Sequence, residues 1–192
     1  MAADTREKIL QVASKLIVRQ GYTATSISQI AGETGIGKAT VYHHFPDKEA
    51  IVYALLDRSS SRVHETLSAV NAGDDPHRQI EAIAQAGIRL RGESFDLFQV
   101  IRREVPGSRN RVHAELASFF VVYTTQFTNA IQMGIRQGIF RRVDPSEAAR
   151  TLLTMLAGLY VQIYLSGDRI PDPEKTIRSM LDIFFRGIET RG

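Results

Sequence analysis

The chain has 192 residues, of which 43% are hydrophobic and 23% charged, as in one or two ordinary globular domains. It contains no cysteine, which excludes disulfides, thiol catalysis and cysteine-based zinc sites and is compatible with the cytoplasm. The formal net charge is +3, and residues 1–58 carry seven Lys or Arg against six Asp or Glu, so bulk charge marks no polyanion-binding region. The longest apolar stretch, residues 152–165, is too short to span a bilayer, and the N-terminal residues do not resemble a signal peptide.

Apolar residues recur at helical spacing along nearly the whole chain, which predicts an all-α fold of about nine helices. The helices expected in the first part of the chain cover about residues 5–20, 27–34, 38–45 and 47–71. Gly35 ends the second of these helices and Pro46 ends the third. This part therefore predicts a three-helix head followed by a connecting helix.

The second part of the chain is predicted to form a bundle of five helices. Three of them open with the same dipeptide, in which Asp caps the helix and Pro occupies its first position: Asp75-Pro76, Asp144-Pro145 and Asp172-Pro173. Between the first two, we expect a short helix that begins at Ser94 and ends before Pro106. A long helix should follow from about Val112 to Gln137, where Gly138 ends it.

The two short helices at 27–34 and 38–45 have the features of a helix-turn-helix. Ala31 is small enough for a close crossing, and Gly35 permits a tight turn. Ile30, Ile36 and Val41 are spaced to seal the inside of the corner. In such a motif the second helix lies in the major groove of DNA. Inward Val41 and Phe45 would leave an outer face made of Lys38, Ala39, Thr40, Tyr42, His43 and His44.

The sequences GYTATSISQIA at 21–31 and GIGKATVYHHFPDKE at 35–49 resemble the N-terminal domain of the TetR family of transcriptional regulators. The resemblance covers about residues 6–58 and continues in the helix order and in GIRQGIFR at 134–141. Gly37 stands where the family often has a capping Ser, a modest loss for the helix. The resemblance implies a DNA-binding domain at 1–48 (connecting helix 47–71) and a ligand-binding and dimerisation domain at 49–192.

The function implied is that of a dimeric repressor, without a cofactor, that binds a near-palindromic operator and is released by a small, largely apolar effector. By position in the motif, Tyr42 and Lys48 would contact phosphates, Lys38 and His43 would contact base edges, and Ala39 would pack on a thymine methyl. The phosphate contacts would be completed, at the N-terminus of a helix and on the recognition helix, by Thr25, Ser26 and Thr40.

Two further sets of residues are expected to serve the effector and the dimer. Aromatic residues that could line a ligand cavity, or could equally form a packed core, are Phe95, Phe98, Phe119, Phe120, Tyr123 and Phe127. The last two helices would form a four-helix interface with a second subunit, unless their apolar residues are buried within the monomer. The residues expected there are Leu152, Leu156, Gly158, Leu159, Ile177, Leu181 and Phe184.

Other functions fit the sequence less well. GETGIGKA at 32–39 approaches a phosphate-binding P-loop, but Ala39 replaces the magnesium-binding hydroxyl and no strand precedes it. The five histidines show no metal-ligand spacing, and no catalytic dyad or triad is present, so we expect neither a metal site nor an enzyme. A helical ligand carrier without DNA function remains an alternative, which salt-sensitive binding to duplex DNA would exclude.

Overall fold

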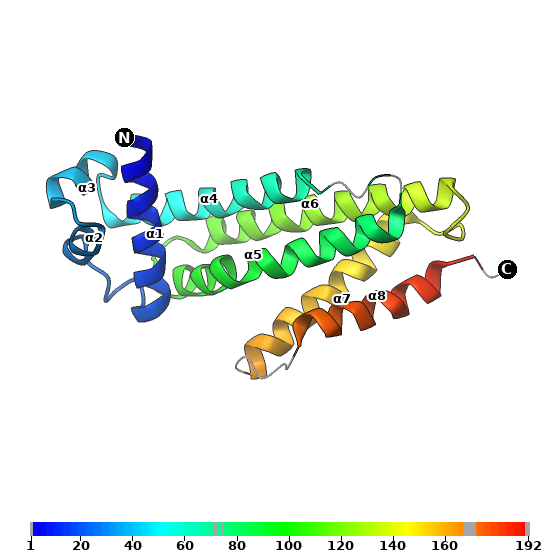
Figure 1. The fold of residues 1–192 in the computed structure, drawn as a ribbon. Coiled ribbons are helices and arrows are strands. Elements are labelled where there is room, and N and C mark those ends of the chain that lie inside the picture. The colour runs from blue at the N-terminus through cyan, green and yellow to red at the C-terminus, as the bar shows by residue number, and fades with distance from the viewer. Residues whose placement is uncertain (1, 71–72, 74, 167–171, 191–192) are drawn as a thin grey trace. The chain divides into compact units, whose positions relative to one another are not determined.

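The computed structural model describes residues 2–70, 73, 75–166 and 172–190, without the side chains of residues 2–3, 88–95, 160 and 163–166. Within these ranges the fold is all-α, as predicted (Figure 1). Its helices are α1 (Ala2–Gln20), α2 (Ile27–Thr34), α3 (Lys38–His44), α4 (Lys48–Ser68), α5 (Pro76–Glu104), α6 (Arg109–Arg136), α7 (Pro145–Ser166) and α8 (Pro173–Ile188). None of them has the length and apolarity that crossing a membrane requires.

The described residues form eight helices because two predicted helices are one. The expected break before Ser94 is wrong, since α5 continues without interruption from Pro76 to Glu104. A single glycine inside a helix costs only about 1 kcal/mol, so Gly92 does not end it. The helix ends at the next strong signal, Pro106-Gly107, where Gly107 has a φ of 75°.

The Asp-Pro dipeptides begin helices as predicted. The Asp172 carboxylate accepts the Lys175 amide at 2.8 Å, with Pro173 in the first turn. Asp75 and Asp144 accept amides of the following turn in the same way, at 2.8–3.2 Å. Each carboxylate satisfies amides that have no partner within the helix.

Two compact units make up the chain. The head unit consists of Met1–Arg62 and Arg91–Ala117, and the bundle unit of Val63–Leu90 and Ser118–Gly192. Helices α4, α5 and α6 each contribute residues to both units. The predicted functional division at residue 48 concerns which residues bind DNA, and it stays a prediction.

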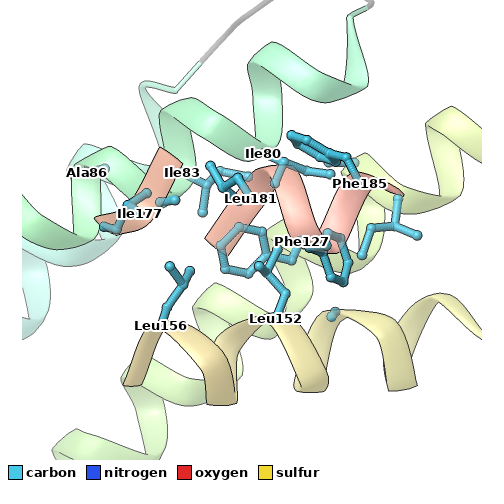
Figure 2. Packing of buried hydrophobic residues seen from close by; sticks show 14 of the residues in the cluster. Ile80, Ile83, Ala86, Phe127, Leu152, Leu156, Ile177, Leu181 and Phe185 are labelled. Carbon is cyan, nitrogen blue, oxygen red and sulfur yellow. The ribbon is translucent and has the colours of Figure 1, made fainter. Parts of the chain in front are cut away.

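The core of the bundle unit is apolar and continuous across its helices. Figure 2 shows Leu152 and Leu156 of α7 facing Leu181 of α8, with Phe127 of α6 among them. Gly134 of α6 lies against the Phe140 ring so closely that any Cβ at this position would collide with it. A short bridge between Phe140 and Glu189 joins the segment after α6 to the end of α8.

Candidate nucleic-acid interface

Helix α2 begins with the capping arrangement that the sequence predicted at Thr25-Ser26. The Ser26 hydroxyl accepts the Gln29 amide at 3.2 Å, and the Gln29 side chain accepts the Ser26 amide at 2.9 Å. Thr25 is buried, and its hydroxyl donates to the Gly21 carbonyl at 2.8 Å. Both hydroxyls thus hold the start of α2 in place. Of the two residues, Ser26 is exposed and Thr25 is not.

The turn between α2 and α3 has the predicted geometry. Gly35 has a φ of 74° and donates its amide to carbonyls of α2, a conformation that other residues rarely adopt. Ile30 and Val41 are fully buried, and Ile36 is half-buried, so these three side chains seal the corner. Gly37 caps α3 without a side-chain hydrogen bond, as expected where the family often has Ser.

The outer face of α3 carries five of the six residues predicted on it. Its exposed side chains are Lys38, Ala39, Thr40, Tyr42 and His43. Tyr42 is 52% exposed although it is large and aromatic. His44 is half-buried, and its ring meets the His43 ring edge-on at 5.5 Å. The face therefore presents hydrogen-bond donors and a methyl group on a helix that Val41 anchors from behind.

Lys48 is held at the start of α4 by the turn between α1 and α2. Its ammonium donates to the carbonyls of Tyr22 at 2.8 Å and Thr25 at 2.7 Å, and it lies 4.0 Å from the centre of the Tyr22 ring. Burial lowers the pKa of Lys48, and the negative charge of Glu104 opposes this effect. Because an ammonium has three donors, the two bonds leave one for a phosphate.

One residue at this site was not predicted from the sequence. The Glu104 carboxylate, at the end of α5, accepts the Thr23 amide at 3.1 Å. It forms an ion pair with Arg103 at 2.8 Å. These two bonds lower the pKa of Glu104, the Arg103 bond contributing most. No local pattern could reveal this contact, since 81 residues separate its partners.

The six aromatics predicted to bind a ligand are divided between the two units. Phe98 is buried in the head unit, and the side chain of Phe95 lies outside the described residues. In the bundle unit, Phe127 is fully buried, with Phe119 and Tyr123 packed against the same core. Phe120 is 52% exposed on the outer side of α6. The bundle unit therefore contains four of the six, of which three belong to one packed core.

An open groove of about 410 Å³ lies between α6 and α7 beside Phe120. Its lining residues are Phe120, Val121, Thr124, Thr125, Arg150, Leu153 and Thr154. The hydroxyls of Thr125 and Thr154 donate to carbonyls of their own helices, and Arg150 pairs with Glu147. The groove surface is therefore mostly apolar.

The residues predicted at a dimer interface lie mainly inside the monomer. Six of the seven belong to the buried core of the bundle unit: Leu152, Leu156, Leu159, Ile177, Leu181 and Phe184. Only Gly158 is exposed, and a Cβ there would meet no atom within 4 Å. These six side chains are therefore buried within a single subunit, which is the alternative that the sequence left open.

His77 has a distant carboxylate partner, Glu189, that its sequence neighbours do not reveal. Its Nε2 lies 3.0 Å from Glu189, and its ring meets Phe140 and Phe185 edge-on at 5.0 and 4.6 Å. His77 thereby connects the start of α5 with the end of α8. Among the described residues, no group of three or more His, Asp or Glu side chains could hold a metal ion.

Comparison with known proteins identifies two family domains. A model described as bacterial regulatory proteins, tetR family, matches residues 9–55. A second, described as tetracyclin repressor-like, C-terminal domain, matches residues 73–188, which is more than half of the chain.

One curated protein and two solved structures are similar to this chain over nearly their whole length, at low sequence identity. The uncharacterized HTH-type transcriptional regulator YvkB of Bacillus subtilis is 23% identical over 186 residues, covering 96% of this chain and 97% of that protein. A transcriptional regulator from Saccharomonospora viridis, solved in complex with choline, has a TM-score of 0.79 at 24% identity, covering 98% and 100%. The SmeT–triclosan complex has a TM-score of 0.75 at 21% identity, covering 98% and 93%. The two solved structures share the fold of this chain.

Proposed function

This chain belongs to the TetR family of bacterial regulatory proteins, and from that premise we propose that it is a dimeric repressor that a small, largely apolar effector releases from its operator. Its family and its relatives are transcriptional regulators and not enzymes, and so is this chain. We propose that it acts in the cytoplasm, where it would bind DNA.

The observation that carries this proposal is the outer face of α3. An exposed tyrosine and an exposed lysine stand on a short helix that the buried Val41 fixes to the head. A lysine can donate to guanine O6 and N7, and Tyr42 and the third donor of Lys48 suit phosphate oxygens. We therefore assign base contacts to Lys38 and His43 and a thymine methyl contact to Ala39.

Selection of bound duplexes from random DNA tests the function directly. We expect enrichment of a near-palindromic sequence, bound without nucleotide and with an affinity that falls steeply as salt rises. An ATP requirement would instead favour a P-loop protein. Failure to retain any duplex at low salt, together with tight binding of a small molecule, would favour a ligand carrier.

We propose that two chains pair through the outer faces of α7 and α8, which are side by side in Figure 1. Val161 is 56% exposed and Ile183 is 62% exposed, and the exposed Gly158 and Gly187 allow a close approach of backbones. A four-helix interface of this kind would set the spacing of two heads on successive major grooves. These exposed residues replace the six buried ones as the proposed contacts.

Gly158 offers a test that leaves the monomer fold intact. Because a side chain at this position would meet no neighbour, Gly158→Arg should fold yet sediment as a monomer. Gly158→Ala is the matched control and should remain a dimer. A wild-type protein that sediments as a monomer at micromolar concentration would contradict the proposal.

We propose that the effector binds in the bundle unit. The solved structures with choline and triclosan support a small-molecule ligand, and the mostly apolar groove beside Phe120 supports an apolar one. Phe98 lies in the head unit, and we assign it to packing there. Operator DNA should weaken effector binding by the same factor by which the effector weakens DNA binding.

A further inference from the structure

Glu104 makes a long-range polar contact with the turn that joins α1 to α2. Its carboxylate accepts the backbone amide of Thr23, a residue of that turn. The side chain is only 19% exposed and forms an ion pair with the exposed Arg103. A charged acceptor makes a stronger hydrogen bond than a neutral one, so the turn is bound firmly to the end of α5.

Gly21 makes this contact possible. It has a φ of 90°, and a Cβ at this position would lie 2.8 Å from one Glu104 oxygen and 3.0 Å from the other. Any other residue would be strained in its backbone and would push the carboxylate away from Thr23. The turn is therefore shaped to receive the carboxylate.

The same turn holds Lys48. The ammonium of Lys48 donates to the carbonyls of Tyr22 and Thr25, which lie on either side of Thr23 along the chain. Glu104 thus holds the middle of the segment whose carbonyls orient Lys48. Its negative charge also favours the protonated form of Lys48.

We propose that Glu104 is a positioning residue for DNA binding, which holds the α1–α2 turn, and through it Lys48 and the start of α2, in the arrangement that meets DNA. This inference rests on the proposed DNA-binding function. Glu104 itself is acidic and would repel a phosphate, so it acts only through the turn. Removing its charge therefore has two opposite effects on DNA binding: the turn loses a bond that orients Lys48, and the protein loses a charge that repels phosphate. Operator and non-operator DNA can distinguish the two effects.

The experiment compares operator and non-operator DNA. Fluorescence anisotropy would give the Kd for the duplex selected above and for a scrambled duplex of equal length. The variants are Glu104→Ala and Glu104→Gln. The control is Asp96→Asn, which removes the same charge from an exposed position of α5 in the head unit.

We expect Glu104→Ala to weaken operator binding about tenfold, because a charged hydrogen bond to the turn is lost. Its binding to the scrambled duplex should be unchanged or tighter, since one negative charge has been removed. In Glu104→Gln the glutamine side chain can still accept the Thr23 amide, so this variant should lose less operator affinity than Glu104→Ala. Asp96→Asn should bind the operator within about twofold of wild type, because its charge touches no part of the turn.

Exchange of the Thr23 amide with solvent, followed by NMR on the free protein, tests the contact without DNA. We expect faster exchange in Glu104→Ala and unchanged exchange in Asp96→Asn. In addition, Gly21→Ala should weaken operator binding less in the Glu104→Ala background than in wild type, because the collision with the carboxylate is gone.

Operator affinity equal to wild type in Glu104→Ala would overturn the inference, and so would unchanged exchange of the Thr23 amide. An equal loss of affinity for both duplexes would also overturn it, because that result indicates general damage to the fold. If the wild-type protein bound no duplex, the proposed function would fail. The Thr23 exchange would then still decide whether Glu104 holds the turn.

Discussion

In the head unit, polar groups that lie far apart in the sequence bond to one another, whereas the core of the bundle unit is built from apolar side chains. Lys48 bonds to the turn before α2, Arg58 pairs with Glu7, and Arg111 pairs with Asp57. In the bundle unit, Phe127, Leu152 and Leu181 come from three helices and meet in one continuous cluster.

The difference follows from what each unit has to do. The helices α2 and α3 have only eight and seven residues, so apolar area alone orients them weakly, and caps and charged bonds add direction. The longer helices of the bundle unit bury whole faces, so apolar packing contributes most to holding them. Substitutions in the two units should therefore have different consequences.

The largest effect is expected in the core of the bundle unit. Leu181→Ala should lower the free energy of unfolding by about 2–5 kcal/mol, because it removes a buried side chain and leaves a cavity in the core. Denaturant unfolding followed by circular dichroism measures this loss. Val121→Ala, at a position of α6 that is 65% exposed, is the control and should change the free energy of unfolding little. A similar loss for both variants would contradict the division into core and outer face.

Lys38→Ala should change sequence preference without changing stability. Loss of a base contact costs about 1–3 kcal/mol of discrimination at one position of the operator, and Lys38 is exposed. Repeated selection from random DNA would reveal the relaxed position. Lys15→Ala removes the same charge from an exposed position of α1 and should leave the selected sequence unaltered. An unchanged selected sequence in Lys38→Ala would remove Lys38 from the base contacts.

Lys48→Ala should lower both the stability of the fold and the affinity for DNA, because Lys48 stabilises the turn and is proposed to contact phosphate. Loss of its two charged hydrogen bonds should cost about 1–3 kcal/mol of folding free energy. The dependence of operator affinity on salt should also fall by about one unit per head. A lower stability with an unchanged salt dependence would mean that Lys48 is structural only.

The smallest expected effect is the dependence on pH of the stability that Glu104 contributes. Because Arg103 and the Thr23 amide hold the pKa of Glu104 below its usual value, the carboxylate stabilises the folded state above the unfolded pKa, about 4.3. This contribution disappears as the pH falls through the lower pKa of the folded state. The difference in unfolding free energy between wild type and Glu104→Gln should therefore be smaller at about pH 3 than at about pH 7. An equal difference at both pH values would show that ionised Glu104 does not stabilise the head.

The sequence by itself determined the features that depend on neighbouring residues. The all-α fold, the Asp-Pro starts, the turn at Gly35 and the outer face of α3 all follow from local signals, and the structure has each of them within the described residues. Caps and turns depend on residues three or four positions apart, and a short pattern contains that information completely.

Only the tertiary structure decided which helical faces are inside and which distant groups meet. The predicted dimer residues Leu152 and Leu181 are apolar, and an apolar stripe fits a subunit interface as well as a monomer core. The break expected at Ser94 was a weak local signal, which the continuous helix α5 overrides. The contact between Glu104 and Thr23 depends on how the end of α5 packs within the head unit, because a lone carboxylate in a sequence carries no sign of the amide that it will accept.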